Sequence, residues 1–266
     1  MPEIVKAHAY GNDFLFTLAE GVGGEDLPAL ARGACNRHTG IGADGLIVYN
    51  PCPGGASMRL FNADGSVAEV SGNGVRCLGA LLAEEGDAGS QHPGEVFRIS
   101  TDAGVKTLTL IEAIGRRFTF RAAMGAPENI RQLDLLAGGE RVKAVALTVG
   151  NPQCVVLGGP LTDRRLSDLG PAIERHPMFP QRTNVELATL EDAGRVRILI
   201  WERGVGPTQA SGTGACAAVV AAAAFGGAPR ELDVVSPGGT QHVEWRDDGL
   251  YLTGWATVVL RGWWLG

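Results

Sequence analysis

The chain has 266 residues, of which 45% are hydrophobic and 20% are charged, a balance typical of a globular protein with a sizeable core. Its formal net charge of −6 argues against a nucleic-acid or anionic-membrane surface, so we expect a small-molecule partner, no nucleic acid and no membrane. Because the N-terminus lacks the pattern of a secretion signal and no apolar run is long enough to span a bilayer, we expect a cytoplasmic protein.

The five cysteines are scattered and show no C-x-x-C spacing. Neither a disulfide framework nor a zinc site is therefore predicted. We expect the thiols to be buried or idle, and we expect no metal.

Short β-branched segments alternate with a few helical segments in both halves. The predicted strands of the first half are residues 4–8, 14–18, 46–49, 57–61, 97–101, 106–111 and 117–121, and its helices are 27–35 and 74–85. The predicted strands of the second half are residues 142–149, 154–157, 184–187, 196–201, 231–235, 242–245 and 250–253, and its helices are 167–175 and 213–225. We place the domain boundary at the Gly115-Arg116 turn, which gives an N-terminal domain of residues 1–115, joined by the last residues of the chain, and a C-terminal domain of residues 116–258.

Residues 215–225 are apolar all the way round the predicted helix. Such a helix must be covered on every side, and it is too short to cross a bilayer. A curved sheet that closes around a central helix satisfies this requirement. The predicted fold class is α+β, with a mainly antiparallel sheet around one helix in each half.

Two short motifs are near copies of each other, and each opens directly into an apolar helix. They are residues 71–74 (Ser-Gly-Asn-Gly) and residues 211–214 (Ser-Gly-Thr-Gly). Glycines allow backbone N–H groups to approach a ligand, and a helix N-terminus favours negative charge. Each motif therefore predicts a site for a carboxylate, and we expect both to hold one ligand, with Ser71 and Ser211 on opposite faces of its Cα.

Five segments at predicted strand ends are rich in polar residues and glycine: residues 8–13, 61–66, 150–153, 183–186 and 201–204. One such segment is usually a turn. Five of them beside a duplicated anion motif favour a binding site for an amino acid. Asparagine amides can bind both ammonium and carboxylate groups, and Arg203 can bind a carboxylate with two hydrogen bonds.

The order of these motifs resembles the diaminopimelate epimerase family. The resemblance rests on residues 6–14 (Lys-Ala-His, then Gly-Asn-Asp-Phe), 61–66, 71–77, 150–152, 202–204 and 212–215, and it covers nearly the whole chain. It implies two pseudo-symmetric α+β domains with the site in the cleft between them. It also implies a homodimeric epimerase that needs no cofactor, neither pyridoxal phosphate nor a metal, and that acts on LL-diaminopimelate in lysine and peptidoglycan precursor synthesis.

The resemblance also implies roles for particular residues. The residues that correspond to the substrate-binding positions are Asn12, Asn62, Gly72, Asn73, Asn151, Asn184, Glu202, Arg203, Gly212 and Thr213. The family has cysteines before its two Gly-x-Gly elements, one acting as thiolate base and one as thiol acid. This chain has Ser71 and Ser211 there, and Gln153 where the family has a supporting histidine.

These departures weaken the expected chemistry. A thiol has a pKa near 8.5, which a helix N-terminus lowers further, whereas a serine hydroxyl needs a neighbouring base. Gln153, a neutral amide, is no such base. We therefore expect Ser71 and Ser211 to bind better than they catalyse, with a loss on the order of 10²–10⁴ in rate for each missing base.

The sequence leaves several interpretations open. The serines are either substitutions made to hold a substrate complex or natural divergence, and Gln153 favours divergence because trapping a complex would not require it. Glu202 and Asp64 are the remaining acid–base candidates. The first alternative is an isomerase or dehydratase that uses the Glu202 carboxylate as its base. The second is an amino-acid-binding protein without catalytic activity.

Overall fold

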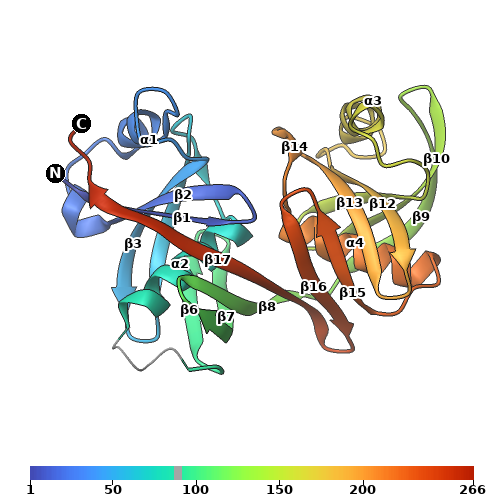
Figure 1. Ribbon diagram of the computed structural model, residues 1–266. Coiled ribbons are helices and arrows are strands. Elements are labelled where there is room, and N and C mark those ends of the chain that lie inside the picture. Colours follow the sequence, from blue (N-terminus) through green and yellow to red (C-terminus); the bar gives the residue numbers. More distant parts are fainter. Residues whose placement is uncertain (87–91) are drawn as a thin grey trace. The chain divides into compact units, whose positions relative to one another are not determined.

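The computed structural model describes residues 1–86 and 92–266, and the chain divides into two compact units (Figure 1). Unit 1 consists of Met1–Ala122 together with Gly254–Gly266, and unit 2 consists of Ala123–Thr253. The chain leaves unit 1 within strand β8 (Arg117–Gly125) and returns to it within strand β17 (Gly249–Trp263). The Gly115-Arg116 turn lies between β7 and β8, inside unit 1.

Unit 1 is a mixed sheet around helix α2. Its elements are β1 (Glu3–Ala9), β2 (Asn12–Leu18), the 3₁₀ turn η1 (Ala19–Val22), α1 (Leu27–Cys35), β3 (Gly45–Cys52), β4 (Gly55–Asn62), β5 (Val67–Ala68), α2 (Gly72–Glu85), β6 (Val96–Thr101) and β7 (Gly104–Ile114), with parts of β8 and β17. The pairing order is β17, β1, β2, β3, β4, β6, β7 and β8, in which β2–β3 and β4–β6 are parallel and the other pairs antiparallel. Helix α2 contacts β1 and β2 as well as β6 and β7, so this sheet curves around it.

Unit 2 has the same plan around helix α4. Its elements are β9 (Glu128–Ala137), β10 (Glu140–Thr148), β11 (Pro152–Leu157), α3 (Asp163–Glu174), β12 (Asn184–Asp192), β13 (Arg195–Glu202), β14 (Gly206–Thr208), α4 (Gly212–Phe225), β15 (Glu231–Ser236) and β16 (Gly239–Arg246), with the start of β17. The pairing order is β9, β10, β11, β12, β13, β15, β16 and β17, in which β11–β12 and β13–β15 are parallel. Helix α4 contacts β10, β11, β12, β13, β15 and β16.

The two units therefore repeat one topology, strand for strand. In both, a helix joins each parallel pair, because parallel neighbours need a crossover connection. Helices α1 and α3 make the first crossover, and α2 and α4 make the second. This repeat makes Gly214 the counterpart of Gly74, and it makes β12 the counterpart of β3.

The apolar helix predicted from the sequence is confirmed as the core of unit 2. Residues 215–222 of α4 are fully buried and pack against the inner faces of the surrounding strands. All four predicted helices are present, with α3 beginning four residues earlier than residue 167. Strand β9 was not anticipated. No helix within the described residues is long and apolar enough to cross a membrane.

Candidate active site

Both duplicated motifs form capped helix tips. The Ser71 hydroxyl accepts a hydrogen bond from Gly74 N at 3.1 Å, and the Ser211 hydroxyl accepts one from Gly214 N at 3.2 Å. The first N–H groups of a helix have no partner within the helix, and the macrodipole adds partial positive charge there. Each tip can therefore bind an anion through the backbone that follows its serine.

In unit 1 a chain of side-chain hydrogen bonds leads away from the α2 tip. Arg76 Nη1 donates to Asn73 Oδ1 at 3.1 Å, Asn73 Nδ2 donates to Asn12 Oδ1 at 3.1 Å, and Asn12 Nδ2 donates to Asp44 Oδ2 at 2.6 Å. The chain begins at a cation and ends at a carboxylate, so it fixes the orientation of both amides. It joins Asn12 and Asn73, which the sequence predicted, to Arg76 and Asp44, which it did not.

Two cations hold the acidic end of this chain. Asp13 forms ion pairs with Lys6 at 2.9 Å and with Arg37 at 2.7 Å, and Arg37 also reaches Asp44 at 2.8 Å. Burial alone would raise the pKa of Asp13, but the hydrogen bonds and charges of Arg37 and Lys6 outweigh it and hold that pKa below its ordinary value. Asp13 therefore stays ionised and anchors the start of β2.

Asn62 and Asp64 lie in the turn after β4. Asn62 Nδ2 donates to Ser66 Oγ at 2.9 Å, and Asp64 Oδ1 accepts from both Ser66 N and Ser66 Oγ. The hydrogen bonds from Ser66 hold the pKa of Asp64 below its ordinary value. Asp64 thus has a structural partner in this turn. Asn62 pairs in register with Gly45, which follows Asp44, so it lies beside the Asn12–Asp44 contact.

In unit 2 the predicted polar residues form two contacts at the edge of β11 and β12. Gln153 Nε2 donates to Asn151 Oδ1 at 2.6 Å, and Asn184 Oδ1 accepts from Arg203 N at 2.8 Å. Gln153 and Asn184 are register partners in the parallel β11–β12 pair, so the two contacts adjoin. The Arg203 guanidinium donates to Gln181 O at 3.0 Å.

Glu174, at the end of α3, supports the turn that carries Glu202 and Arg203. Its carboxylate accepts from Trp201 Nε1 at 2.8 Å and from Gly204 N at 3.0 Å, and it lies 3.5 Å from Arg182. Sequence reasoning missed Glu174 because nothing in a helix pattern marks one glutamate as facing a distant loop.

Glu186 lies within the polar segment 183–186 that the sequence singles out, but nothing in the sequence assigned it a role. It lies on β12 two positions after Asn184, and so on the same face of the sheet, which faces α4. Its side chain is fully buried, and within the described residues neither carboxylate oxygen has a hydrogen-bond partner. Burial, with the charge of Glu202 adding to it, raises the pKa of Glu186 well above its ordinary value, so burial favours the neutral acid over the carboxylate.

Glu186 lies directly behind the α4 tip. A Cβ built on Gly214 would lie 2.6 Å from Glu186 Oε1 and 3.2 Å from Ser211 Cβ. The carboxyl group and the serine therefore flank one point, and only glycine fits between them. The alternating polar pattern of residues 184–186 was the signal that could have found Glu186.

Comparison with known proteins shows the family of the chain. A family model described as diaminopimelate epimerase matches residues 4–129 and 145–259. A diaminopimelate epimerase from Moorella thermoacetica is 41% identical over 276 residues and covers 97% of both chains, and the chloroplastic enzyme of Oryza sativa subsp. japonica is 37% identical over 97% of this chain and 78% of its own. The chain belongs to the diaminopimelate epimerase family.

Solved structures extend the fold beyond this family. A predicted epimerase from Pseudomonas aeruginosa superposes with a TM-score of 0.74 at 15% identity and covers 100% of both chains. A hydroxyproline epimerase from Agrobacterium vitis, with bound trans-4-hydroxy-L-proline, gives a TM-score of 0.67 at 16% identity and covers 98% of this chain and 90% of its own. At these identities the likeness shows a shared mixed α/β fold. As a member of the diaminopimelate epimerase family, this chain is an isomerase.

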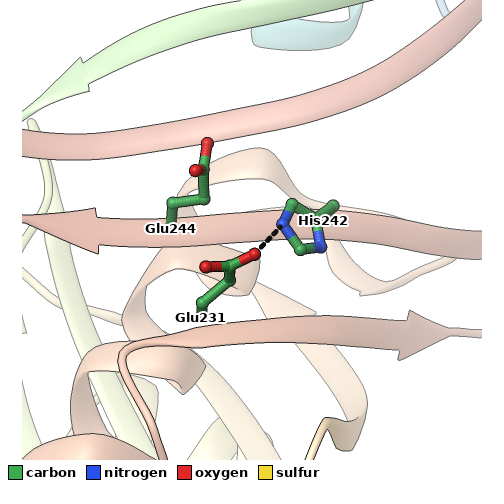
Figure 2. Close-up of side chains that lie close together, drawn as sticks. All are labelled: Glu231, His242 and Glu244. Carbon is green, nitrogen blue, oxygen red and sulfur yellow. Dashed lines mark ion pairs between the residues drawn. The ribbon is translucent and has the colours of Figure 1, made fainter.

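One further polar cluster lies outside the family motifs (Figure 2). Potential ligand atoms of Glu231, His242 and Glu244 lie within 4.8 Å of one another. However, Glu231 and Asp233 bind the two ring nitrogens of His242 at 3.3 and 2.9 Å, and Glu244 pairs with Arg246. We interpret the cluster as contacts of His242 between β15 and β16, beside an ion pair within β16.

Proposed function

We propose that this chain is an amino-acid epimerase that interconverts LL- and meso-diaminopimelate by moving the proton at Cα, and that it is impaired by serine at both base positions. The observation that carries the proposal is the repeat of one capped, glycine-flanked helix tip in two units of identical topology. A two-base epimerase needs a proton acceptor and a proton donor on opposite faces of one carbon. A duplicated tip is suited to provide both.

In this proposal the two pseudo-symmetric units enclose the ligand in the cleft between them. The reacting carboxylate binds the backbone of Gly72 and Asn73 at one tip and of Gly212 and Thr213 at the other. The rest of the zwitterion binds the asparagines and the charged pair, namely Asn12, Asn62, Asn151, Asn184, Glu202 and Arg203. No cofactor takes part, and the enzyme acts as a homodimer.

The serines limit the rate because a hydroxyl at a helix tip remains protonated at neutral pH. A thiol there would be partly ionised, since its pKa begins near 8.5 and the helix dipole lowers it. Gln153 bonds to Asn151 and has no group that accepts a proton at neutral pH. The expected loss is on the order of 10²–10⁴ for each missing base.

The test is α-proton exchange in D₂O with LL-diaminopimelate, followed by NMR. The variants are Ser71→Cys, Ser211→Cys and the double substitution, with Ser100→Cys, at an exposed position of β6, as the matched control. We expect the double substitution to raise the exchange rate by about 10²-fold or more, and Ser100→Cys to leave it unchanged. Absence of exchange in every variant would overturn the assignment.

Two rival functions use the same site residues. An isomerase or dehydratase with a carboxylate base is favoured by the closeness of Glu186 and Glu202 on the inner face of unit 2. Glu202→Gln would abolish turnover in that enzyme. A binding protein without chemistry would bind a diamino diacid in calorimetry and exchange no α-proton even with both cysteines restored.

A further inference from the structure

The repeat makes Glu186 stand out, because the same place in unit 1 holds an apolar side chain. A Cβ built on Gly74 would lie 2.9 Å from Ile47 Cδ1 and 3.3 Å from Ser71 Cβ, whereas the one on Gly214 would meet Glu186 Oε1. Ile47 and Glu186 occupy the third positions of the equivalent strands β3 and β12. An isoleucine fills this space, so packing does not require an acid.

Burying an acid without hydrogen bonds is costly, and polar atoms left this way in a fold call for an explanation. Neither Glu186 oxygen has a hydrogen-bond partner within the described residues, although a Cβ built on Gly214 would meet both Glu186 Oε1 and the Cβ of Ser211. Ser211 in turn is N-cap of α4, at the front of the same tip. The acid and Ser211, which is expected to face the ligand, thus both border the position of Gly214.

We propose that Glu186 is a proton relay behind Ser211, which makes the α4 tip the proton-donating side of the epimerase. This inference rests on the proposed function. Ser211 gives its hydroxyl proton to the Cα carbanion and forms the C–H bond, while the Glu186 carboxylic acid gives its proton to Ser211 Oγ. The carboxylate left at Glu186 regains a proton from solvent, or takes the Ser211 proton when Ser211 removes a proton from Cα in the reverse direction.

The groups around Glu186 support this role. Burial raises its pKa, which favours the neutral acid, and the charge of Glu202 on β13 adds to this effect. On β11, Gln153 cannot titrate, and the buried Cys154 thiol, which packs on the opposite, α3 side of the sheet, has a pKa raised by burial and by Glu186. On α4 the neighbours are Ser211 and Gly214. Glu186 is therefore a buried acid that can hold a transferable proton behind the α4 tip.

The experiment places a thiol base at position 71, at the α2 tip, and then varies the residues at positions 186 and 211, at the α4 tip. Four variants are compared by α-deuterium uptake from LL- and meso-diaminopimelate: Ser71→Cys, Ser71→Cys with Glu186→Gln, Ser71→Cys with Ser211→Cys, and all three substitutions together. We expect Glu186→Gln to slow exchange by about 10²-fold when Ser211 is present and by less than about threefold when a thiol replaces it. Glu140→Gln, a surface partner of Arg165, is the carboxylate control.

Equal effects of Glu186→Gln in both backgrounds would overturn the relay and leave the epimerase assignment standing. The relay is also overturned, and the epimerase assignment still stands, if Glu186→Gln does not slow deuterium uptake by the Ser71→Cys chain while the chain with both cysteines is active. Absence of α-deuterium uptake in all four variants would overturn both the proposed function and the relay. If the Glu186→Gln variant does not fold, Glu186→Ile replaces it, because isoleucine is the residue at the equivalent position of unit 1. An infrared carboxylic-acid band that disappears with either substitution verifies the resting neutral acid.

Discussion

Arg76 fixes the side chain of Asn73 in one orientation by donating to its Oδ1 at 3.1 Å, so the Asn73 amide nitrogen is left to donate to Asn12. Arg76 is itself buried, and its guanidinium lies 5.7 Å from the centre of the Tyr10 ring. The backbone of Asn73 belongs to the α2 tip. A side chain with no direct place in the proposed chemistry thus holds the tip in position.

We expect Arg76→Met to destabilise the protein by about 1–3 kcal/mol, because Asn73 Oδ1 is left buried and unpaired. Urea unfolding measures the change. Arg59→Met is the matched control, since Arg59 is exposed and lies over the Phe61 ring. An Arg76→Met chain as stable as the Arg59→Met chain would show that the Asn73 orientation does not depend on the guanidinium.

Gly214→Ala should destabilise unit 2 by about 1–3 kcal/mol, because the new methyl group would lie 2.6 Å from Glu186 Oε1. Gly72→Ala, in the first turn of α2 with open space around it, should change stability little. The cost of Gly214→Ala should shrink in a Glu186→Ala background, which a double-mutant cycle measures. Full additivity would contradict the contact.

The buried acid predicts a specific pH dependence of stability. The pKa of Glu186 is raised in the folded chain, so the folded state keeps a proton that the unfolded state releases above its ordinary value of 4.5. Stability is therefore lost as the pH rises above 4.5, by at most about 1.4 kcal/mol per pH unit. Glu186→Gln should gain stability relative to the parent from pH 5 to pH 8, and Glu140→Gln should not. Parallel curves for parent and Glu186→Gln would contradict the neutral acid.

The ion pairs of Asp13 predict the opposite dependence of stability on pH. Its pKa is lowered from the ordinary 3.8 because Arg37 and Lys6 outweigh the effect of burial. The stability that this carboxylate contributes is present above 3.8 and is lost as the pH falls through the lower folded pKa. Asp13→Asn should be less stable than the parent at pH 7, and the gap should close in acid. The exposed Asp134→Asn serves as control, and a gap independent of pH would rule out the ion pairs as its source.

The sequence predicted the elements whose pattern is local. The N-cap serines, the glycines after them and the all-apolar α4 each identify a helix without reference to the rest of the chain. Strand β9 was missed because its sequence is largely polar and exposed, although the Gly138-Gly139 pair, with φ of 55° and 78°, marks its hairpin with β10.

The residues missed at the site depend on long-range packing. Arg76 and Glu174 lie on helices, where their sequence neighbours do not reveal which loop they reach. Glu186 looked like an ordinary polar residue at a strand end, because only the placement of α4 shows that its face is the inner one. Sequence motifs predict the backbone that is proposed to face the ligand. The side chains that support this backbone can be identified only from the tertiary structure.

The serine caps put two demands on one atom. The same Oγ that steadies the first turn of α2 or α4 is the atom that a faster enzyme would exchange for sulfur, and sulfur is a poor hydrogen-bond acceptor. Removing a serine cap typically weakens a helix start by about 1 kcal/mol. A chain with thiols at positions 71 and 211 would therefore have less stable helix starts and more reactive groups. Substitution at these two positions is expected to raise turnover and to lower thermal stability.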